Sequence, residues 1–459
     1  MVRVLSACEQ FDVIWRELGG APEVADCTAF EGRGEWPSVF AVSDLAAASI
    51  GAAGAAVAEL MSFRFGEVPE VTVDRRLASL WFAWSIKPLG WSLPSPWDPI
   101  AGDYRAADGW IRLHTNAPHH RDAALAVLGV QAEKQTVAQA VERWSADELE
   151  QAVVERGGCA AVMRSIDEWA RHEQGTHVNA EPLVAVTPAN AAAAISDWMP
   201  EAARPLRGLR VLDLTRVLAG PVATRFLAAF GADVLRIDPP DWEEPVAIPE
   251  VALGKRCARL DLRETQGRAR LRELLSQAHV LVHGYRADAL DRLGFDADTR
   301  RKLCPGLIDV SLDAYGWSGQ WRNRRGFDSL VQMSAGIADA GMRKLARDKP
   351  TPLPVQALDH ATGYLMAAAV VRGLSQRCAT GQGSQARLSL ARTAKLLIDG
   401  PPGEVSGEAP APTAADYSAE IEASAFGPLA RLKAPILIDG APMRWDRPAT
   451  ALGSAAPEW

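Results

Sequence analysis

The chain has 459 residues, of which 48% are hydrophobic and 23% are charged, a balance that is typical of a globular protein and excludes a disordered or fibrous chain. Its formal net charge is −8 and no basic stretch stands out, so nucleic acid is not an expected partner. At about 100–200 residues per domain, the length predicts two to four domains.

The N-terminal segment and the cysteines favour a cytoplasmic protein. The first residues, MVRVLSACEQFDVIW, lack the basic segment and apolar core of a secretory signal. The longest apolar stretch, Ala46–Leu60, contains Ser49 and Glu59 and is shorter than the ~18 residues that a membrane span needs. The cysteines are scattered, and the histidines, including His119 and His120, show no ligand spacing and are interpreted as surface residues. We therefore expect no membrane partner, no disulfide framework and no metal site.

The first third of the chain contains a helical segment that has a faint copy near the C-terminus. Val42–Leu80 aligns without gaps on Ala357–Lys395, at an offset of 315 residues, and Asp44 falls on Asp359. Each segment shows a helical pattern, a turn marked by glycine and an alternating strand. The agreement of all three features predicts an internal duplication.

The stretch Trp97–Val186 is typical of a small α+β domain. Gly102–His114 shows a two-stranded pattern, and three helical stretches follow it. An Ala- and Pro-rich stretch comes next and indicates a linker.

A strand–helix–strand pattern begins near residue 206. Arg210–Leu214 is a short apolar run typical of a buried strand, Val222–Phe230 is helical, and Gly231–Asp238 is a second strand-like run. Such a βαβ unit favours a parallel sheet. We therefore predict an α/β fold with a doubly wound, mostly parallel sheet. Further strand-like runs follow at Cys257–Leu262, His279–His283 and Leu307–Leu312.

The turn after the first of these strands argues against a nicotinamide cofactor. The dinucleotide fingerprint needs Gly-x-Gly-x-x-Gly at this turn. Here the turn reads Leu218-Ala219-Gly220-Pro221, and one glycine followed by proline cannot form that pyrophosphate cradle.

A long helix is predicted over Leu353–Arg377. Asp359 stands at its start and two glycines follow its end, as cap residues do. Without other information, Asp359 would be interpreted as a helix N-cap. A second stretch rich in Pro, Gly, Glu and Ala separates this region from the C-terminal tail.

Several blocks of the chain resemble the family III CoA-transferases, the CaiB/BaiF family. LRGLRVLDLTRVLAGPVATRFLAAFGADVLRID resembles the opening of the family, and DALDRLGF, DVSLDAYGWSG and GFDSLVQMSAG resemble its next motifs in the expected order. LDHATGYLMAAAVVRGLSQRCATGQGSQARLSL resembles the segment with the catalytic aspartate, which Asp359 matches.

The resemblance implies an unusual domain order. In the family the small domain follows the aspartate helix of the large domain, whereas here it precedes the large domain. We interpret the chain as one functional unit in permuted order, left by a fusion of two copies. The expected segments are a partial first copy with an aspartate-type helix (1–90), the small α+β domain (91–187), a linker (188–205), the Rossmann-like CoA-binding and catalytic domain (206–399), a second linker (400–418) and a tail that returns to the large domain (419–459).

The family chemistry implies transfer of CoA from an acyl-CoA donor to a small carboxylic acid through a covalent aspartyl intermediate. CoA is then part of the substrate, and no permanently bound cofactor is expected. Asp359 suits the role of nucleophile because backbone N–H groups at a helix N-terminus would keep it ionised. Asp44 has the same local setting, but no βαβ domain precedes it to hold CoA, so it is interpreted as a cap residue.

The resemblance also implies a set of CoA-binding residues, because CoA carries a pyrophosphate and a 3′-phosphate that attract basic side chains. A solvated surface position is the alternative interpretation for each of the basic residues. The implied residues are Arg216, Leu218 and Ala219 near the thioester, Lys255, Arg256 and Arg292 at basic positions of the CoA-binding stretches, and Tyr285 beside the adenine.

Two alternatives to a transferase stay open. The family includes racemases, which place a histidine before the aspartate of a Gly-His-Asp motif; here the motif is Gly326-Phe327-Asp328, and phenylalanine cannot move a proton. His360 is adjacent to Asp359, but helix neighbours point about 100° apart. The other alternative is a non-catalytic CoA-binding or partner paralogue, since the chain is rearranged and the motif that usually resembles ENFRPG reads HGYRAD here.

A homodimer is the expected assembly, whereas a monomer would suggest that the front segment fills the partner's place.

Overall fold

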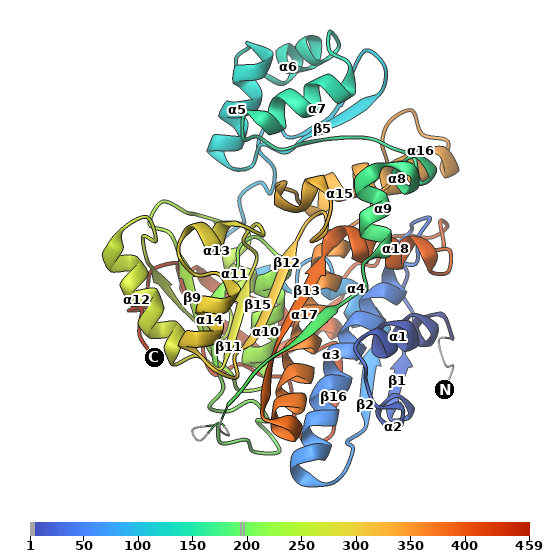
Figure 1. The fold of residues 1–459 in the computed structure, drawn as a ribbon. Coiled ribbons are helices and arrows are strands. Elements are labelled where there is room, and N and C mark those ends of the chain that lie inside the picture. The colour runs from blue at the N-terminus through green and yellow to red at the C-terminus, as the bar shows by residue number, and fades with distance from the viewer. Residues whose placement is uncertain (1–4, 193–194, 196–197) are drawn as a thin grey trace.

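A seven-stranded sheet forms the centre of the larger part of the molecule in the computed structural model, which describes residues 5–192, 195 and 198–459 (Figure 1). The strand order is β10-β9-β8-β11-β12-β13-β7, in which β7 is antiparallel and the other six strands are parallel. This confirms the predicted α/β fold with a mostly parallel sheet. The strands are β7 (Ala185–Ala191), β8 (Arg210–Leu214), β9 (Asp233–Asp238), β10 (Lys255–Arg259), β11 (Val280–His283), β12 (Ile308–Asp313) and β13 (Gln382–Ser389).

Helices cover both faces of this sheet, which explains why its inner strands are apolar along their whole length. On β8, Val211 belongs to the core that contains α10 and α17, while Leu212 on the opposite face belongs to the core that contains α12. Successive side chains of a strand point to opposite faces, so each strand joins two cores. The covering helices are α10 (Ala219–Ala229) and α17 (Ala357–Thr380) on one face and α12 (Thr265–Ser276) and α14 (Ala297–Leu303) on the other (Figure 1).

Helix α10 begins at Ala219, three residues before the predicted start. Pro221 lies in its first turn, where its missing N–H has no consequence because first-turn amides have no partner inside the helix. The turn after β8 is correspondingly short, and Leu218 is the N-cap residue.

The two aspartate helices share geometry as well as sequence pattern. Helix α3 (Val42–Phe65) and α17 have bounds that differ by 315 residues, and each ends at a left-handed glycine. Each is followed by a strand and a second helix, β2 and α4 after α3 and β13 and α18 after α17. The side chain of Asp74 accepts the N–H of the residue three positions later, and Ser389, also 315 residues on, does the same. These elements are β2 (Val71–Asp74), α4 (Arg75–Trp81) and α18 (Leu390–Asp399).

The two halves exchange their edge strands. After the small domain, β7 joins β13 of the large sheet, whereas β16 near the C-terminus joins β2 of the first copy, and both pairs are antiparallel. Helices α3 and α17 pack side by side (Figure 1). Strand β7 also extends into the stretch 188–205 that was predicted to be a linker, because it completes the edge of the large sheet. The remaining elements of this region are α1 (Leu5–Glu17), α2 (Pro22–Asp26), β1 (Thr28–Glu31) and β16 (Ile436–Ile438).

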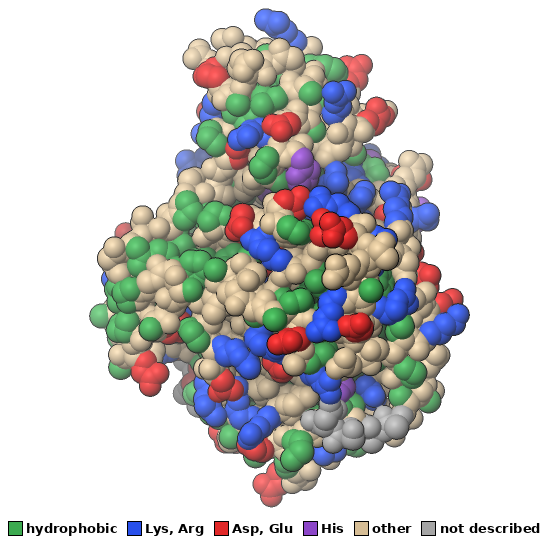
Figure 2. Space-filling model, turned by 90° about the vertical axis from the view of Figure 1, so that its left-hand side faces the viewer, with side chains coloured by type: hydrophobic (Ala, Val, Ile, Leu, Met, Phe, Trp, Pro, Cys, Tyr) green, Lys and Arg blue, Asp and Glu red, His purple; other side chains and the backbone are tan. Residues whose placement is uncertain are grey.

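The small domain is the narrower upper part of the molecule and has its own core (Figures 1 and 2). A three-stranded sheet of order β4-β5-β6 packs against α5, α6 and α7. On the face in Figure 2, basic and acidic side chains are interspersed. Its elements are β4 (Gly102–Arg105), β5 (Trp110–Leu113), α5 (Pro118–Leu128), α6 (Lys134–Val141), α7 (Ala146–Glu155) and β6 (Ala160–Val162), after which α8 (Ile166–Arg171) and α9 (Glu173–Ala180) return to β7.

The other elements connect these parts. A third small sheet has the order β14-β15-β3, so a segment after α4 pairs with the C-terminal tail. These elements are β3 (Ile86–Pro88), α11 (Ile248–Val251), α13 (Ala289–Arg292), α15 (Asp328–Ser334), α16 (Ile337–Lys344), β14 (Tyr417–Ser424) and β15 (Gly427–Leu432), with 3-10 turns over Gln320–Asn323 and Ala414–Asp416.

Helix α3 is the one helix, among the residues that the structure describes, with the length and apolar composition to cross a membrane. Of its most apolar window, 89% is buried inside the protein. Its packing against α1 and α17 accounts for this composition as that of a core helix.

Gly363 allows α17 to approach the start of α10 closely. A Cβ at this position would lie 2.4 Å from the carbonyl oxygen of Ala219 and 2.9 Å from Cβ of Val222. We expect Gly363→Ala to lower the free energy of unfolding by about 1–3 kcal/mol, because the helices must move apart. Chemical denaturation measures the change, with Gly109→Ala as the control because a Cβ there meets no atom within 4 Å. Equal losses in the two variants would contradict this account.

Candidate active site

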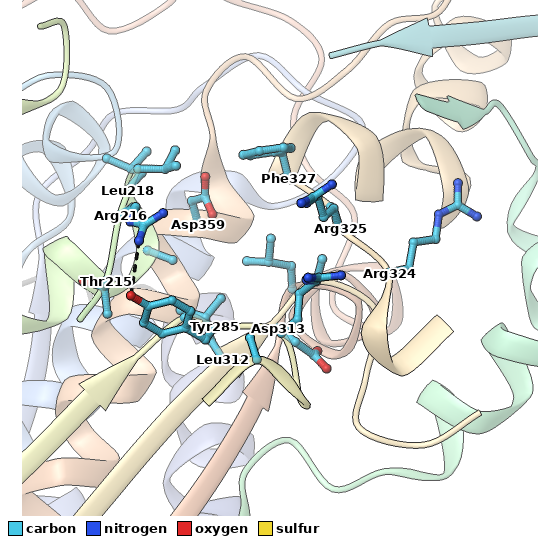
Figure 3. Close-up of a pocket in the computed structure, with 18 of the residues that line it drawn as sticks. Thr215, Arg216, Leu218, Tyr285, Leu312, Asp313, Arg324, Arg325, Phe327 and Asp359 are labelled. Atoms are coloured by element: carbon cyan, nitrogen blue, oxygen red, sulfur yellow. Dashed lines mark hydrogen bonds between the residues drawn. The ribbon is translucent and has the colours of Figure 1, made fainter. Parts of the chain in front are cut away.

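Two adjoining cavities open at the carboxyl ends of the parallel strands, and Figure 3 shows residues that line the first of them. The first has a volume of about 390 Å³ and is lined by residues at or just after the ends of β8, β11 and β12, among them Arg216, Tyr285 and Asp313. The chain order of the strands reverses between β8 and β11. In open parallel sheets this reversal leaves a crevice in which ligands bind. The cavity therefore lies where the topology predicts a binding site.

Asp359 lies where the two cavities meet. It is the third residue of α17 and only 8% exposed, and it lines both cavities. Figure 3 shows its carboxylate between Leu218 and Phe327. Among the described residues, no lysine or arginine forms an ion pair with Asp359. Its position combines burial with access to two separate spaces.

Asp328 holds the start of α17 and raises the pKa of Asp359. Its carboxylate accepts the backbone N–H of Asp359 at 2.9 Å and that of Leu358. Burial and the charge of Asp328 raise the pKa of Asp359 well above the usual value for aspartate. Burial likewise raises the pKa of Asp328 itself to about 6. The expectation that backbone N–H groups keep Asp359 ionised is thus wrong in its detail, because Asp328 accepts them instead.

Neither aspartate helix is capped by its aspartate. Gln356 is the N-cap residue of α17 and Ala41 that of α3, and neither side chain caps its helix. The interpretation of Asp44 as a cap residue is therefore wrong. Its carboxylate lies 2.6 Å from Nε of Arg75, which also pairs with Glu35.

One substitution distinguishes the two aspartate positions. Arg75, which pairs with Asp44, falls on Leu390 at the offset of 315 residues. Leu390 lines the first cavity. The copy that contains Asp359 therefore has no counterpart of Arg75, the arginine that pairs with Asp44. The carboxylate of Asp359 is thus left for a ligand.

We expect Asp328→Asn to shift the acid limb of the kcat/KM profile to lower pH by about one pH unit. A negative charge at Asp328 opposes ionisation of Asp359, so its removal lowers the pKa of Asp359. Asparagine keeps an oxygen that can accept the N–H of Asp359. Asp44→Asn on the duplicated helix is the matched control and should leave the limb in place. An unchanged limb in Asp328→Asn would contradict the electrostatic role of this residue.

Three guanidinium groups line the first cavity without a carboxylate partner among the described residues. They belong to Arg216, Arg286 and Arg325. Arg216 donates to the hydroxyl of Tyr285 at 3.2 Å and lies over the Trp242 ring, 5.0 Å from its centroid (Figure 3). Burial and the charge of Arg325 lower the pKa of Arg286, which means that the two cations repel each other. Such a cluster is suited to an anion with several oxygens, such as a phosphate or pyrophosphate.

The structure brings four of the predicted CoA-binding residues together with Asp359. Arg216, Leu218, Ala219 and Tyr285 all line the first cavity, and Leu218 lines the second as well. They follow β8 and β11, the strands between which the order reverses. Their contacts with CoA stay a prediction.

The other three predicted CoA-binding residues, all of them basic, line neither cavity. Lys255 is buried, and its Nζ lies 3.0 Å from Oδ2 of Asp213, so it ties β10 to β8. Arg256 pairs with Asp233 at 2.8 Å, and Arg292 pairs with Asp288 one helical turn away. A role of these residues toward CoA stays a prediction.

Two histidines of the small domain contact the ring of Phe327, which their spacing in the sequence did not indicate. His114 stacks on Phe327 with ring centroids 3.8 Å apart, and His120 contacts the same ring at 5.8 Å. His119 lines both cavities. His120 is only 4% exposed, so its interpretation as a surface residue is wrong: α5 turns it toward Phe327. Burial lowers the pKa values of His114 and His120 to about 3, so both rings are neutral near pH 7.

The part of the chain that the structure describes contains no cluster of three or more His, Cys, Asp or Glu side chains that could hold a metal ion. The groups that face the two cavities are arginines, aromatic rings and carboxylates. They are suited to an organic anion.

The fold and the site together define an α/β protein with one buried carboxylate at the junction of an arginine-lined cavity and a larger cavity. Residues 206–428 match the model of CoA-transferase family III. This part of the chain is similar to family III of the CoA-transferases, as the resemblance predicted.

Two curated relatives agree with this similarity in sequence. The chain is 29% identical over 323 residues to an acyl-CoA transferase of Gibberella moniliformis, covering 64% of this chain and 56% of the relative. It is 31% identical over 195 residues to the succinyl-CoA:glutarate CoA-transferase of Mus musculus, covering 39% and 44%. A solved structure of a CaiB/BaiF family protein from Brucella suis aligns with a TM-score of 0.39 at 28% identity, covering 42% of this chain and 55% of that chain. The chain spans about half the length of the curated relatives it matches.

Proposed function

We propose that the chain is an acyl-CoA:carboxylate CoA-transferase with Asp359 as its nucleophile. The observation that carries this proposal is the position of Asp359, which joins an arginine-lined cavity to a larger cavity with apolar walls. CoA enters as part of the substrate, with its phosphates near Arg216, Arg286 and Arg325 and its thioester beside Asp359. The strand order of the large sheet supports a doubly wound, Rossmann-like arrangement of this domain.

The first half-reaction converts the donor into an enzyme-bound thioester. A carboxylate oxygen of Asp359 attacks the thioester carbonyl, the C–S bond breaks and the CoA thiolate leaves, which forms a mixed anhydride. The thiolate then attacks the carbonyl carbon of Asp359. The anhydride C–O bond breaks, the donor acid leaves, and CoA is bound to Asp359 as a thioester.

The second half-reaction returns CoA to the acceptor. The acceptor carboxylate attacks the aspartyl thioester and releases the thiolate. The thiolate then attacks the acceptor carbonyl of the resulting anhydride and frees Asp359. Each step develops negative charge on an oxygen near Ala219, whose N–H lies in the first turn of α10 and has no partner within that helix.

A transfer assay separates this function from its alternatives. The assay supplies hexanoyl-CoA with ¹³C-labelled carboxylic acids and measures labelled acyl-CoA by mass spectrometry. We expect label to enter the CoA ester. Binding of CoA with no transfer to any acid would support the non-catalytic paralogue. Exchange of the α-hydrogen of a 2-methylacyl-CoA in D₂O would instead support a racemase, although Phe327 supplies no base at the histidine position.

We further propose that the protein acts in the cytoplasm as a homodimer. The alternative is a monomer, because helix α17 is already covered by α3 of the same chain and the two halves exchange β7 and β16. Light scattering decides the assembly: twice the mass of one chain supports a homodimer, whereas the mass of one chain means that the front segment fills the partner's place.

A further inference from the structure

The second cavity differs from the first in the chemistry of its walls, and it points to the kind of acid that receives CoA. Resting on the proposed transferase function, we infer that the acceptor is a bulky, uncharged monocarboxylic acid rather than a dicarboxylic acid. The carboxyl group of this acid would meet Asp359, and its apolar remainder would occupy the second cavity.

The second cavity is large and mostly apolar. Its volume is about 910 Å³, and its walls include the half-buried rings of Trp84, Trp97, Trp242 and Phe327. Val217 and Leu218 also line it, and Figure 3 shows Leu218 near Asp359. Pockets of this size hold ligands with many carbon atoms, and aromatic walls favour apolar groups.

No fixed positive charge faces this cavity. Among the described residues that line it there is no lysine and no arginine, whereas four arginines line the first cavity. The two histidines are His114 and His119, and burial lowers the pKa of each, which favours the neutral ring. A second carboxylate on the substrate would therefore lose water without gaining a cationic partner, which is costly.

The acidic residues at the rim do not favour a cationic substrate either, because each of them already pairs with an arginine outside the lining. Asp98 pairs with Arg121 at 3.3 Å, and Asp241 pairs with Arg263 at 3.2 Å. The remaining rim contacts are Glu244 with Arg236 at 2.8 Å, Glu243 with Arg259, and Asp122 with Arg121 at 3.8 Å. Each of these carboxylates therefore already has an arginine partner, although Arg121 is shared by Asp98 and Asp122. None is left unpaired for a cation, so an uncharged acyl group fits the rim best.

Acceptor competition tests this inference. With hexanoyl-CoA as the donor, kcat/KM is measured for 4-phenylbutanoate, glutarate and 4-(trimethylammonio)butanoate. We expect 4-phenylbutanoate to be preferred over each charged acid by at least about 100-fold. A preference for glutarate or for the ammonium acid would overturn the inference while leaving the transferase function intact. Absence of transfer to all three acids, together with no covalent adduct on Asp359, would overturn the function itself. An adduct without transfer to 4-phenylbutanoate would overturn only the inference.

An engineered charge provides a second, independent test. Val246 lines the second cavity, and Val246→Arg would introduce the missing cation. We expect this variant to raise kcat/KM for glutarate relative to 4-phenylbutanoate by about 10-fold or more, whereas Val246→Leu should keep the apolar preference. An unchanged ratio in Val246→Arg, with the variant folded by circular dichroism, would contradict the assignment of this cavity to the acceptor.

Discussion

Replacement of Asp359 by asparagine is expected to lower kcat for CoA transfer by about four orders of magnitude or more. The side chain keeps its shape but loses the carboxylate oxygen that forms the anhydride, so no alternative nucleophile completes the reaction. Steady-state transfer assays measure the loss, and isothermal titration with CoA shows whether binding persists.

The same variant should be more stable than the parent chain. Burial and Asp328 raise the pKa of Asp359 in the folded state, so ionisation of Asp359 destabilises the fold as pH rises. We expect Asp359→Asn to raise the free energy of unfolding by about 1–2 kcal/mol at pH 8, and the gain to disappear near pH 4, where the parent aspartate is protonated when folded.

Asp44→Asn is the matched control because Asp44 occupies the same helical position in the first copy. It should keep transfer activity, and it should lose stability because Asp44 is paired with Arg75 in a buried contact. Loss of transfer in Asp44→Asn with activity retained in Asp359→Asn would reverse the roles assigned to the two helices.

The second large effect concerns the arginines of the first cavity. We expect the double variant Arg286→Gln, Arg325→Gln to raise KM for acyl-CoA by about 100-fold or more, because each charged hydrogen bond to a phosphate contributes about 1.5–3 kcal/mol. Its kcat should change little. Without ligand, the variant should be slightly more stable, since removal of both charges relieves their mutual repulsion.

Arg207→Gln is the control for this pair, because its side chain is exposed, pairs with Glu201 on the surface and lines neither cavity. Arg292→Gln, added to the series, tests the predicted role of that residue. A KM for acyl-CoA that stays unchanged in the double variant would show that the phosphates bind elsewhere. Loss of kcat with no change in KM would contradict a binding role for the two arginines.

Local sequence patterns predicted the parts of the fold that depend on neighbours in the chain. The apolar run Arg210–Leu214 is a buried strand because helices cover both faces of its sheet, and this makes its pattern visible in sequence. The duplicated helix was also recognisable, since Asp44 and Asp359 have the same place on helices of equal length. The parallel sheet followed from strands that alternate with helices.

Contacts between distant segments account for what the sequence did not indicate. Asp328 lies 31 residues before Asp359, and only the tertiary fold places its carboxylate at the start of α17. Lys255 was predicted to bind CoA because it is a basic residue in a CoA-binding stretch. Its partner Asp213 lies on another strand, and this contact accounts for the burial of Lys255. His120 appeared to be a surface residue because the contact with Phe327 joins two domains.

The most direct measurement is peptide mass spectrometry after incubation of the protein with hexanoyl-CoA and hydroxylamine. An activated aspartyl group, whether anhydride or thioester, reacts with hydroxylamine to give an aspartyl hydroxamate. We predict this modification at Asp359 and not at Asp44, and only when acyl-CoA is present. Transfer of CoA with an unmodified Asp359 would contradict the covalent mechanism.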